Sequence, residues 1–139
     1  MDLSKIYRIK MQDNSLTDID FLTGITSFYN TSSSLYLQNN QLNNVDGLSS
    51  LTTAAGSISL QNNKLVNIDG LSLLTSVSGQ LYLQQNILTH VNGLSSLKIV
   101  NQLYLNSNLL TNVDGLSSLT NVTSNFSLND NIDLVDISG

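Results

Sequence analysis

The sequence contains no cysteine, proline or tryptophan, and every acidic residue in it is an aspartate. The absence of cysteine excludes disulfide bonds and thiolate metal ligands. The absence of glutamate excludes any catalytic site built on a pair of glutamates. No stretch of about 18 consecutive apolar residues occurs, so we expect no membrane-spanning helix and no membrane insertion.

Charged residues are scarce as well. They make up 11% of the 139 residues, against roughly 25% in an ordinary soluble domain. Five basic residues stand against ten acidic ones, which gives a formal net charge of −5 at pH 7. Because binding to nucleic acid depends largely on lysine and arginine at the phosphates, the composition argues against nucleic acid as a partner. Asn, Gln, Ser and Thr fill the predicted surface instead.

An internal repeat organises the chain. The frame L-x-L-x-x-N-x-L-x-x-V-D-G-L-x-x-L-T begins at Leu35 and returns with a period of about 23 residues. We therefore predict one domain, residues 1–139, built from six stacked segments that we call coils. Coils 1 to 6 start near residues 9, 35, 58, 81, 103 and 126, and residues 1–8 are expected to form a lid over coil 1. An insertion at 29–34 is expected to bulge out as a loop.

Each coil has the same predicted parts. The L-x-L alternation predicts a short strand with one buried face, and strands at equivalent points of successive coils must run parallel. One asparagine per coil faces inward, where its amide can donate to and accept from the backbone, and forms a structural ladder. The aspartate before glycine, as in Asp46-Gly47, predicts an Asx-type turn or a helix cap. The sequence leaves open whether a short strand or a 3₁₀ turn follows. The ladder asparagines are Asn14, Asn40, Asn63, Asn86, Asn108 and Asn131.

The repeat resembles a known family. The segment N-Q-L-N-N-V-D-G-L-S-S-L-T from Asn40 resembles the leucine-rich repeat of bacterial internalins, and S-V-S-G-Q-L-Y-L from Ser76 resembles coils of the receptor L domain. The resemblance covers about residues 9–139. It implies a leucine-rich-repeat solenoid, α/β by family and mainly β here, with right-handed coils, one parallel sheet, and short 3₁₀, turn or strand segments on the back. Both relatives serve mainly as non-enzymatic binding modules at cell surfaces, so the resemblance implies that class here.

Stacked coils place the outward strand residues in columns. The tyrosine column is Lys10, Tyr36, Ser59, Tyr82, Tyr104 and Ser127; the glutamine column is Gln12, Gln38, Gln61, Gln84, Asn106 and Asn129; the flanking column is Arg8, Ser34, Ser57, Gln80, Gln102 and Asn125. Tyrosine combines apolar area with a polar tip, and glutamine both donates and accepts, so these columns suit a protein or carbohydrate ligand. The alternative is that tyrosine is simply a good residue for an exposed strand. The predicted binding face is Tyr36, Gln38, Gln61, Tyr82, Gln84, Tyr104 and Asn106, with the pair Tyr82–Tyr104 at its centre.

Neither a metal site nor catalysis is predicted. The aspartate column, Asp20, Asp46, Asp69, Asn92 and Asp114, could attract Ca²⁺, but Asn92 fills the position without charge, so a structural turn role is favoured. His90 is the only histidine, and its position is occupied by asparagine in the neighbouring coils. We therefore expect an exposed turn residue there rather than a general base. With no nucleophile motif, phosphate loop or cofactor motif, no enzyme is expected.

Three functions follow from these patterns. The first is a binding module for a protein or a carbohydrate. The second is a structural block that associates end to end through an uncapped last coil, where Phe126, Leu128, Leu134 and Ile137 form an apolar end. The third is a row of threonines, Thr26, Thr52, Thr75 and Thr120, that orders water or ice, although Lys98 interrupts it. The low charge favours an extracellular or cell-surface location, and a natural start at Met1 without an apolar leader would make it cytoplasmic.

Overall fold

The computed structural model describes residues 8–29, 31 and 33–137. The lid predicted at residues 1–8 falls outside this range except for Arg8, which begins the first strand. The described residues form one sheet of eight strands, and all of its pairings are parallel. The strands are β1 (Arg8–Lys10), β2 (Ser27–Phe28), β3 (Ser34–Tyr36), β4 (Thr53–Ala54), β5 (Ile58–Ser59), β6 (Ser76–Tyr82), β7 (Ile99–Tyr104) and β8 (Asn121–Ser127).

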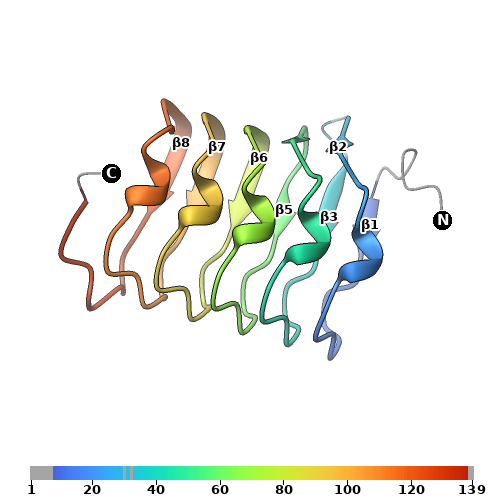
Figure 1. The fold of residues 1–139 in the computed structure, drawn as a ribbon, viewed down its shortest axis with the longest axis horizontal. Helices are drawn as coiled ribbons and strands as arrows, with labels where there is room; N and C mark the ends of the chain where they lie inside the picture. Colours follow the sequence, from blue (N-terminus) through green and yellow to red (C-terminus); the bar gives the residue numbers. More distant parts are fainter. Residues whose placement is uncertain (1–7, 30, 32, 138–139) are drawn as a thin grey trace.

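Five short 3₁₀ helices lie in a row in front of the strands, one in each of the first five coils (Figure 1). The sequence left a strand and a 3₁₀ turn open as alternatives for this part of the coil. The structure contains both, because the 3₁₀ turn comes first and a short strand follows. The prediction of one parallel sheet with short 3₁₀, turn or strand segments is therefore confirmed. The 3₁₀ helices are η1 (Asp20–Leu22), η2 (Asp46–Leu48), η3 (Asp69–Leu71), η4 (Asn92–Leu94) and η5 (Asp114–Leu116).

The strand register follows the repeat. The first apolar residue of each coil pairs with that of the next, in the order Ile9, Leu35, Ile58, Leu81, Leu103 and Phe126. A second line of pairing runs through β2, β4 and the start of β6. In β6 and β7 the two lines join in one strand, with a shift of register between Val77 and Gln80 and between Val100 and Gln102.

The interior is a stack of aliphatic side chains. In each complete coil the two strand leucines, such as Leu81 and Leu83, are fully buried, while Tyr82 between them faces outward. Burying a side chain of this size stabilises the fold by roughly 1.5–3 kcal/mol. The coils also approach one another closely at the 3₁₀ turns. A Cβ on Gly70 would collide with the carbonyl group of Val45 in the preceding coil, so only glycine fits there.

The inward asparagines join neighbouring coils. In coil 4, Asn86 Nδ2 donates to the carbonyl oxygens of Leu83 at 3.0 Å and of Leu60, one coil earlier, at 3.1 Å. Its Oδ1 accepts from the backbone N–H of Leu65 at 3.1 Å. Asn40, Asn63, Asn108 and Asn131 repeat this arrangement and are all buried. Asn14 differs, because it is exposed and donates only within its own coil, to Met11 and Gln12.

The prediction for the aspartate before glycine was wrong. No side-chain cap bond is present at the N-terminus of any of the five 3₁₀ helices. Instead, the asparagine two residues earlier makes the Asx-type bond. Asn44 Oδ1 accepts from the Asp46 N–H at 3.0 Å, and Asn67 and Asn112 do the same for Asp69 and Asp114.

Two further expectations need correction. His90 is half-buried rather than exposed, and its Nδ1 is buried without a hydrogen-bond partner in the described part of the chain. The insertion at 29–34 is exposed in its first part, at Tyr29 and Thr31, whereas Ser33 and Ser34 are buried and lead into β3. Its residues 30 and 32 lie outside the described residues.

Candidate functional site

The sheet brings the predicted tyrosine column together. Strand pairing sets Tyr36 beside Ser59, Ser59 beside Tyr82, and Tyr82 beside Tyr104. At the two ends of this column, Lys10 pairs with Tyr36 and Ser127 pairs with Tyr104. The predicted glutamine column is aligned as well, since backbone bonds join Asp13 to Gln38, Asn39 to Gln61, Asn62 to Gln84 and Gln85 to Asn106 in successive coils.

Tyr82 and Tyr104 stack on each other. Their ring centroids lie 5.0 Å apart, and the ring planes differ by 14°. This separation matches the spacing of neighbouring strands, about 4.8 Å, so the sheet itself sets the stack. The inner faces of the two rings cover each other. The ring edges, the hydroxyl groups and the outer face of each ring, on the sides of Ser59 and Ser127, are what remain for a ligand.

The two hydroxyl groups differ in their partners. Tyr104 donates its hydroxyl proton to Gln102 Oε1 at 2.9 Å and accepts from Asn125 Nδ2 at 3.2 Å. Gln102 in turn donates to Ser124 at 3.3 Å, so Tyr104 is held from two coils. Within the described residues, the Tyr82 hydroxyl has no hydrogen-bond partner. The Tyr82 hydroxyl is therefore available to a ligand, and the hydrogen-bonded Tyr104 packs its ring against the Tyr82 ring.

The surroundings keep the Tyr82 phenol protonated. Burial raises its pKa above the ordinary 10.0, and the nearby hydroxyls of Tyr104 and Tyr36 add to the rise. A neutral phenol can both donate and accept at physiological pH. The same closeness explains why Ser59, between Tyr36 and Tyr82 in the column, is only 3% exposed. We expected Ser59 to face solvent; the larger neighbours on both sides cover it.

The glutamine column contains buried acceptors. The Oε1 atoms of Gln12, Gln38, Gln61 and Gln84 are buried and have no hydrogen-bond partner in the described part of the chain. A buried acceptor without a donor costs about 1–3 kcal/mol, so the amide groups gain when a ligand satisfies them. The terminal torsion of glutamine is broad, and rotation about it exchanges oxygen and nitrogen. The row can therefore present either acceptors or donors.

The face is almost free of charge. Arg8 and Lys10 lie at its β1 end and are exposed, and the other members of the three columns are neutral. The supporting residues of Tyr104 were not predicted from the sequence. Gln102 and Asn125 belong to the flanking column, and no local pattern there indicates that their side chains reach a tyrosine on a neighbouring strand.

Other kinds of site are not built by the described residues. They contain no group of three or more His, Cys or acidic side chains placed to hold a metal ion. They also contain no helix with the length and apolar character needed to cross a membrane. Comparisons with protein-family models, with curated proteins and with solved structures found no match.

Proposed function

We propose that the chain is a leucine-rich-repeat solenoid and acts as a non-enzymatic binding module, whose sheet face holds a protein partner. The observation that carries this proposal is the stacked pair Tyr82–Tyr104, with one hydroxyl held by Gln102 and Asn125 and the other free. A tyrosine fixed in this way loses little side-chain entropy when it binds. Fixed aromatic side chains of this kind dominate the energy of protein interfaces.

The hydrogen-bonding groups of the face favour a protein over a carbohydrate. A sugar ring stacks on an open aromatic face, and the stack leaves Tyr82 and Tyr104 only one outer face each for such a contact. Their hydroxyl groups and the neighbouring amides of Gln61 and Gln84 instead offer hydrogen bonds along a flat surface. Peptide groups, which carry one donor and one acceptor per residue, suit such a surface.

The lack of charge predicts how the partner binds. With Arg8 and Lys10 as the charged members of the face, electrostatic steering contributes little. We therefore expect an association that is slow compared with charge-steered complexes and that changes little with ionic strength.

A defined ligand can be obtained by selecting binders from a displayed library of random peptides on the wild-type chain. The double variant Tyr82→Ala with Tyr104→Ala should bind most of the selected peptides at least about tenfold more weakly. Leu73→Ser is the matched control, because Leu73 is 53% exposed and the corresponding positions in coils 2, 4 and 5 are Ser50, Ser96 and Ser118. Peptides that bind the double variant as well as they bind the control would refute the proposal. A glycan array tests the carbohydrate alternative.

One observation favours the second candidate function, end-to-end assembly. In the described residues β8 pairs only with β7, which leaves its other edge unpaired. Phe126 on this strand is 43% exposed, and Leu128 and Leu134 are only partly buried. A further strand could pair with this edge and cover these side chains.

A row of side chains with an aspartate at each end, Asp13 and Asp130, opposes assembly between copies of this chain, and we call it the charged ladder. Asn39 Nδ2 donates to Asp13 Oδ1 at 2.6 Å, and Asn62 Nδ2 donates to Asn39 Oδ1 at 2.7 Å. Asp130 holds the corresponding position in coil 6, with the same positive φ. If copies stacked in the register of the coils, Asp130 of one copy would face Asp13 of the next at about one strand spacing, 4.8 Å. Two carboxylates at this distance repel, so we rank assembly below binding.

A further inference from the structure

A strip of exposed apolar residues runs along the edge of the later coils, away from the tyrosine face. We call Val66, Ile87, Leu109, Ile132 and Val135 the rim strip. Their exposed fractions are 47%, 45%, 43%, 87% and 89%. Large contiguous apolar patches are rare on the surface of monomeric proteins and commonly mark an interface.

The members of the rim strip lie side by side on successive coils. In coils 3 to 5, the N–H of the residue after the ladder asparagine donates to a carbonyl group of the preceding coil: Lys64 to Leu42 at 2.9 Å, Ile87 to Leu65 at 3.1 Å and Leu109 to Leu88 at 2.9 Å. Lys64 Nζ also donates to Gln41 Oε1 at 3.1 Å, which places these side chains next to each other. Val66 and Val135 bond in the same way to Asn43 and Thr111, one coil earlier.

The fold does not require apolar residues at these positions. Gln41 and Lys64 fill the position of Ile87 in coils 2 and 3, and Asn43 fills the position of Val66 in coil 2. The position of Ile87 therefore changes from polar to apolar along the stack of coils, while the buried positions stay the same. The position of Val66 is occupied by Thr89 and Thr111 in coils 4 and 5 and is apolar again at Val135. An apolar residue that the repeat can replace by a polar one serves something other than the core.

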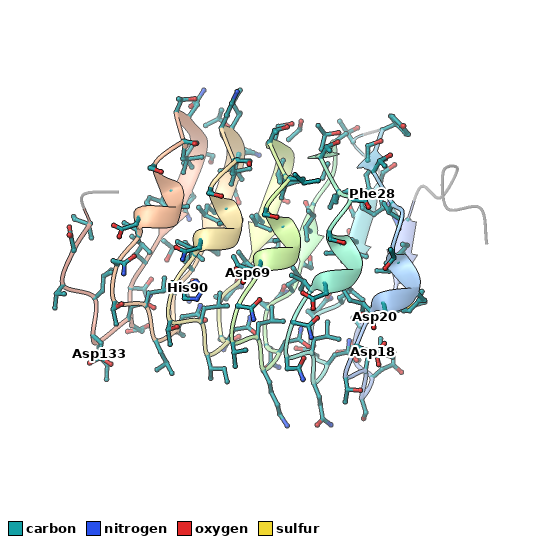
Figure 2. The ribbon with its side chains drawn as sticks, in the orientation of Figure 1. Asp18, Asp20, Phe28, Asp69, His90 and Asp133 are labelled. Carbon is teal, nitrogen blue, oxygen red and sulfur yellow. The ribbon has the colours of Figure 1, made fainter. Side chains whose placement is uncertain are left out.

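The two ends of the strip carry opposite charges. Lys64 borders it in coil 3 and hydrogen-bonds to the neutral amide of Gln41. Asp133 borders it in coil 6, next to Ile132, and lies at the lower edge of the last coil (Figure 2). A two-fold rotation between Ile87 and Leu109 would bring Lys64 of one copy to Asp133 of the other. It would also lay the apolar residues of the two copies against each other.

We propose that the rim strip is the contact surface of an antiparallel homodimer. A two-fold interface uses the same patch on both copies, so the patch must be complementary to itself. The rim strip meets this condition, since reversing it exchanges its cation and its anion. An anionic membrane is a poor alternative, because Asp130 and Asp133 flank the strip and Lys64 is its one neighbouring cation within the described residues.

The area of the strip predicts a weak, reversible dimer. Five partly exposed aliphatic residues cover less than the roughly 800 Å² per partner of a standard interface. We therefore expect association in the micromolar to millimolar range. Such a dimer leaves the tyrosine face open, because the strip lies at the turn that follows each strand, not on the sheet.

The test is a charge exchange, followed by sedimentation velocity from about 10 µM to about 1 mM of the whole chain. Lys64→Asp and Asp133→Lys should each weaken dimerisation about fivefold, because each sets like charges together. The double variant Lys64→Asp with Asp133→Lys should recover the wild-type value. Leu109→Gln should weaken the dimer about tenfold through lost apolar contact.

Leu73→Ser, on a different surface, is the control and should dimerise as the wild type does. Circular dichroism of each variant verifies that the fold is kept. A wild-type chain that stays monomeric over the whole range would overturn the proposal. A dimer that is equally strong in both single charge variants and in Leu109→Gln would also overturn it, and would place the contact elsewhere.

Discussion

Replacing Asn86 with alanine removes one unit of the buried asparagine ladder. Asn86 accepts the backbone N–H of Leu65 and donates to the carbonyl oxygens of Leu60, Leu83 and Gln84, at distances between 3.0 and 3.3 Å. It joins two coils and is 7% exposed. The substitution would leave the Leu65 N–H and the leucine carbonyl groups without partners inside the stack.

The expected loss of stability follows from these bonds. A buried donor or acceptor left unpaired costs about 1–3 kcal/mol, and at least one donor and one acceptor are involved. We expect the free energy of unfolding to fall by about 3–5 kcal/mol, a large share of the roughly 5–15 kcal/mol that small domains have. Asn14→Ala is the matched control. Asn14 is exposed, and the carbonyl groups it bonds can turn to water, so that variant should lose about 1 kcal/mol or less.

Urea unfolding followed by circular dichroism measures both variants. The midpoint should fall sharply for Asn86→Ala and slightly for Asn14→Ala, with the slope unchanged if unfolding stays cooperative. Equal losses for the two variants would refute the reasoning, because they would show that bonding between coils adds nothing to bonding within one coil. A change in slope would instead indicate that coils unfold separately.

Three further predictions concern the turns, the tyrosine column and the charged ladder. Gly70→Ala should destabilise the chain by about 3 kcal/mol, because its Cβ meets the Val45 carbonyl, whereas Ser72→Ala in the same turn should change stability by less than about 0.5 kcal/mol in the same urea assay. Because burial raises the Tyr82 pKa, the folded chain holds that proton more tightly than the unfolded chain does. This contribution to stability is present below pH 10 and is lost as the pH rises. The urea midpoint should therefore fall less in Tyr82→Phe than in the wild type between about pH 9 and about pH 11. Asp130→Asn, placed in a Leu109→Gln background, should associate about fivefold more tightly in sedimentation, since about 1 kcal/mol of repulsion is removed; unchanged association would show that Asp13 and Asp130 do not control stacking.

The positions of the strand residues could be predicted because the repeat leaves no freedom of register. Shifting a strand by one residue would turn its leucines to solvent, so the L-x-L frame alone aligns Tyr36, Ser59, Tyr82 and Tyr104. The parallel sheet follows from the same period, which does not decide between a 3₁₀ turn and a strand on the back of each coil. The inward asparagines could be identified because every coil carries one at the same point.

Details that depend on side-chain reach could not be predicted. Asn44 and Asp46 are both residues that favour Asx turns, and only the backbone geometry decides that Asn44 makes the bond. The bonds from Tyr104 to Gln102 and Asn125 depend on how side chains lie across the sheet. The rim strip was missed for another reason. Its residues vary between coils, so the repeat carries no signal for them.

The most direct test of the proposed function compares dissociation constants for one selected peptide on the wild type, on Tyr82→Ala and on Leu73→Ser, measured by calorimetry. Tyr82 offers the free hydroxyl of the stacked pair, whereas Leu73 lies exposed on another surface. We predict that Tyr82→Ala binds at least about tenfold more weakly and that Leu73→Ser binds as the wild type does. Equal affinity for the wild type and Tyr82→Ala would contradict the proposal that the tyrosine face is the binding surface.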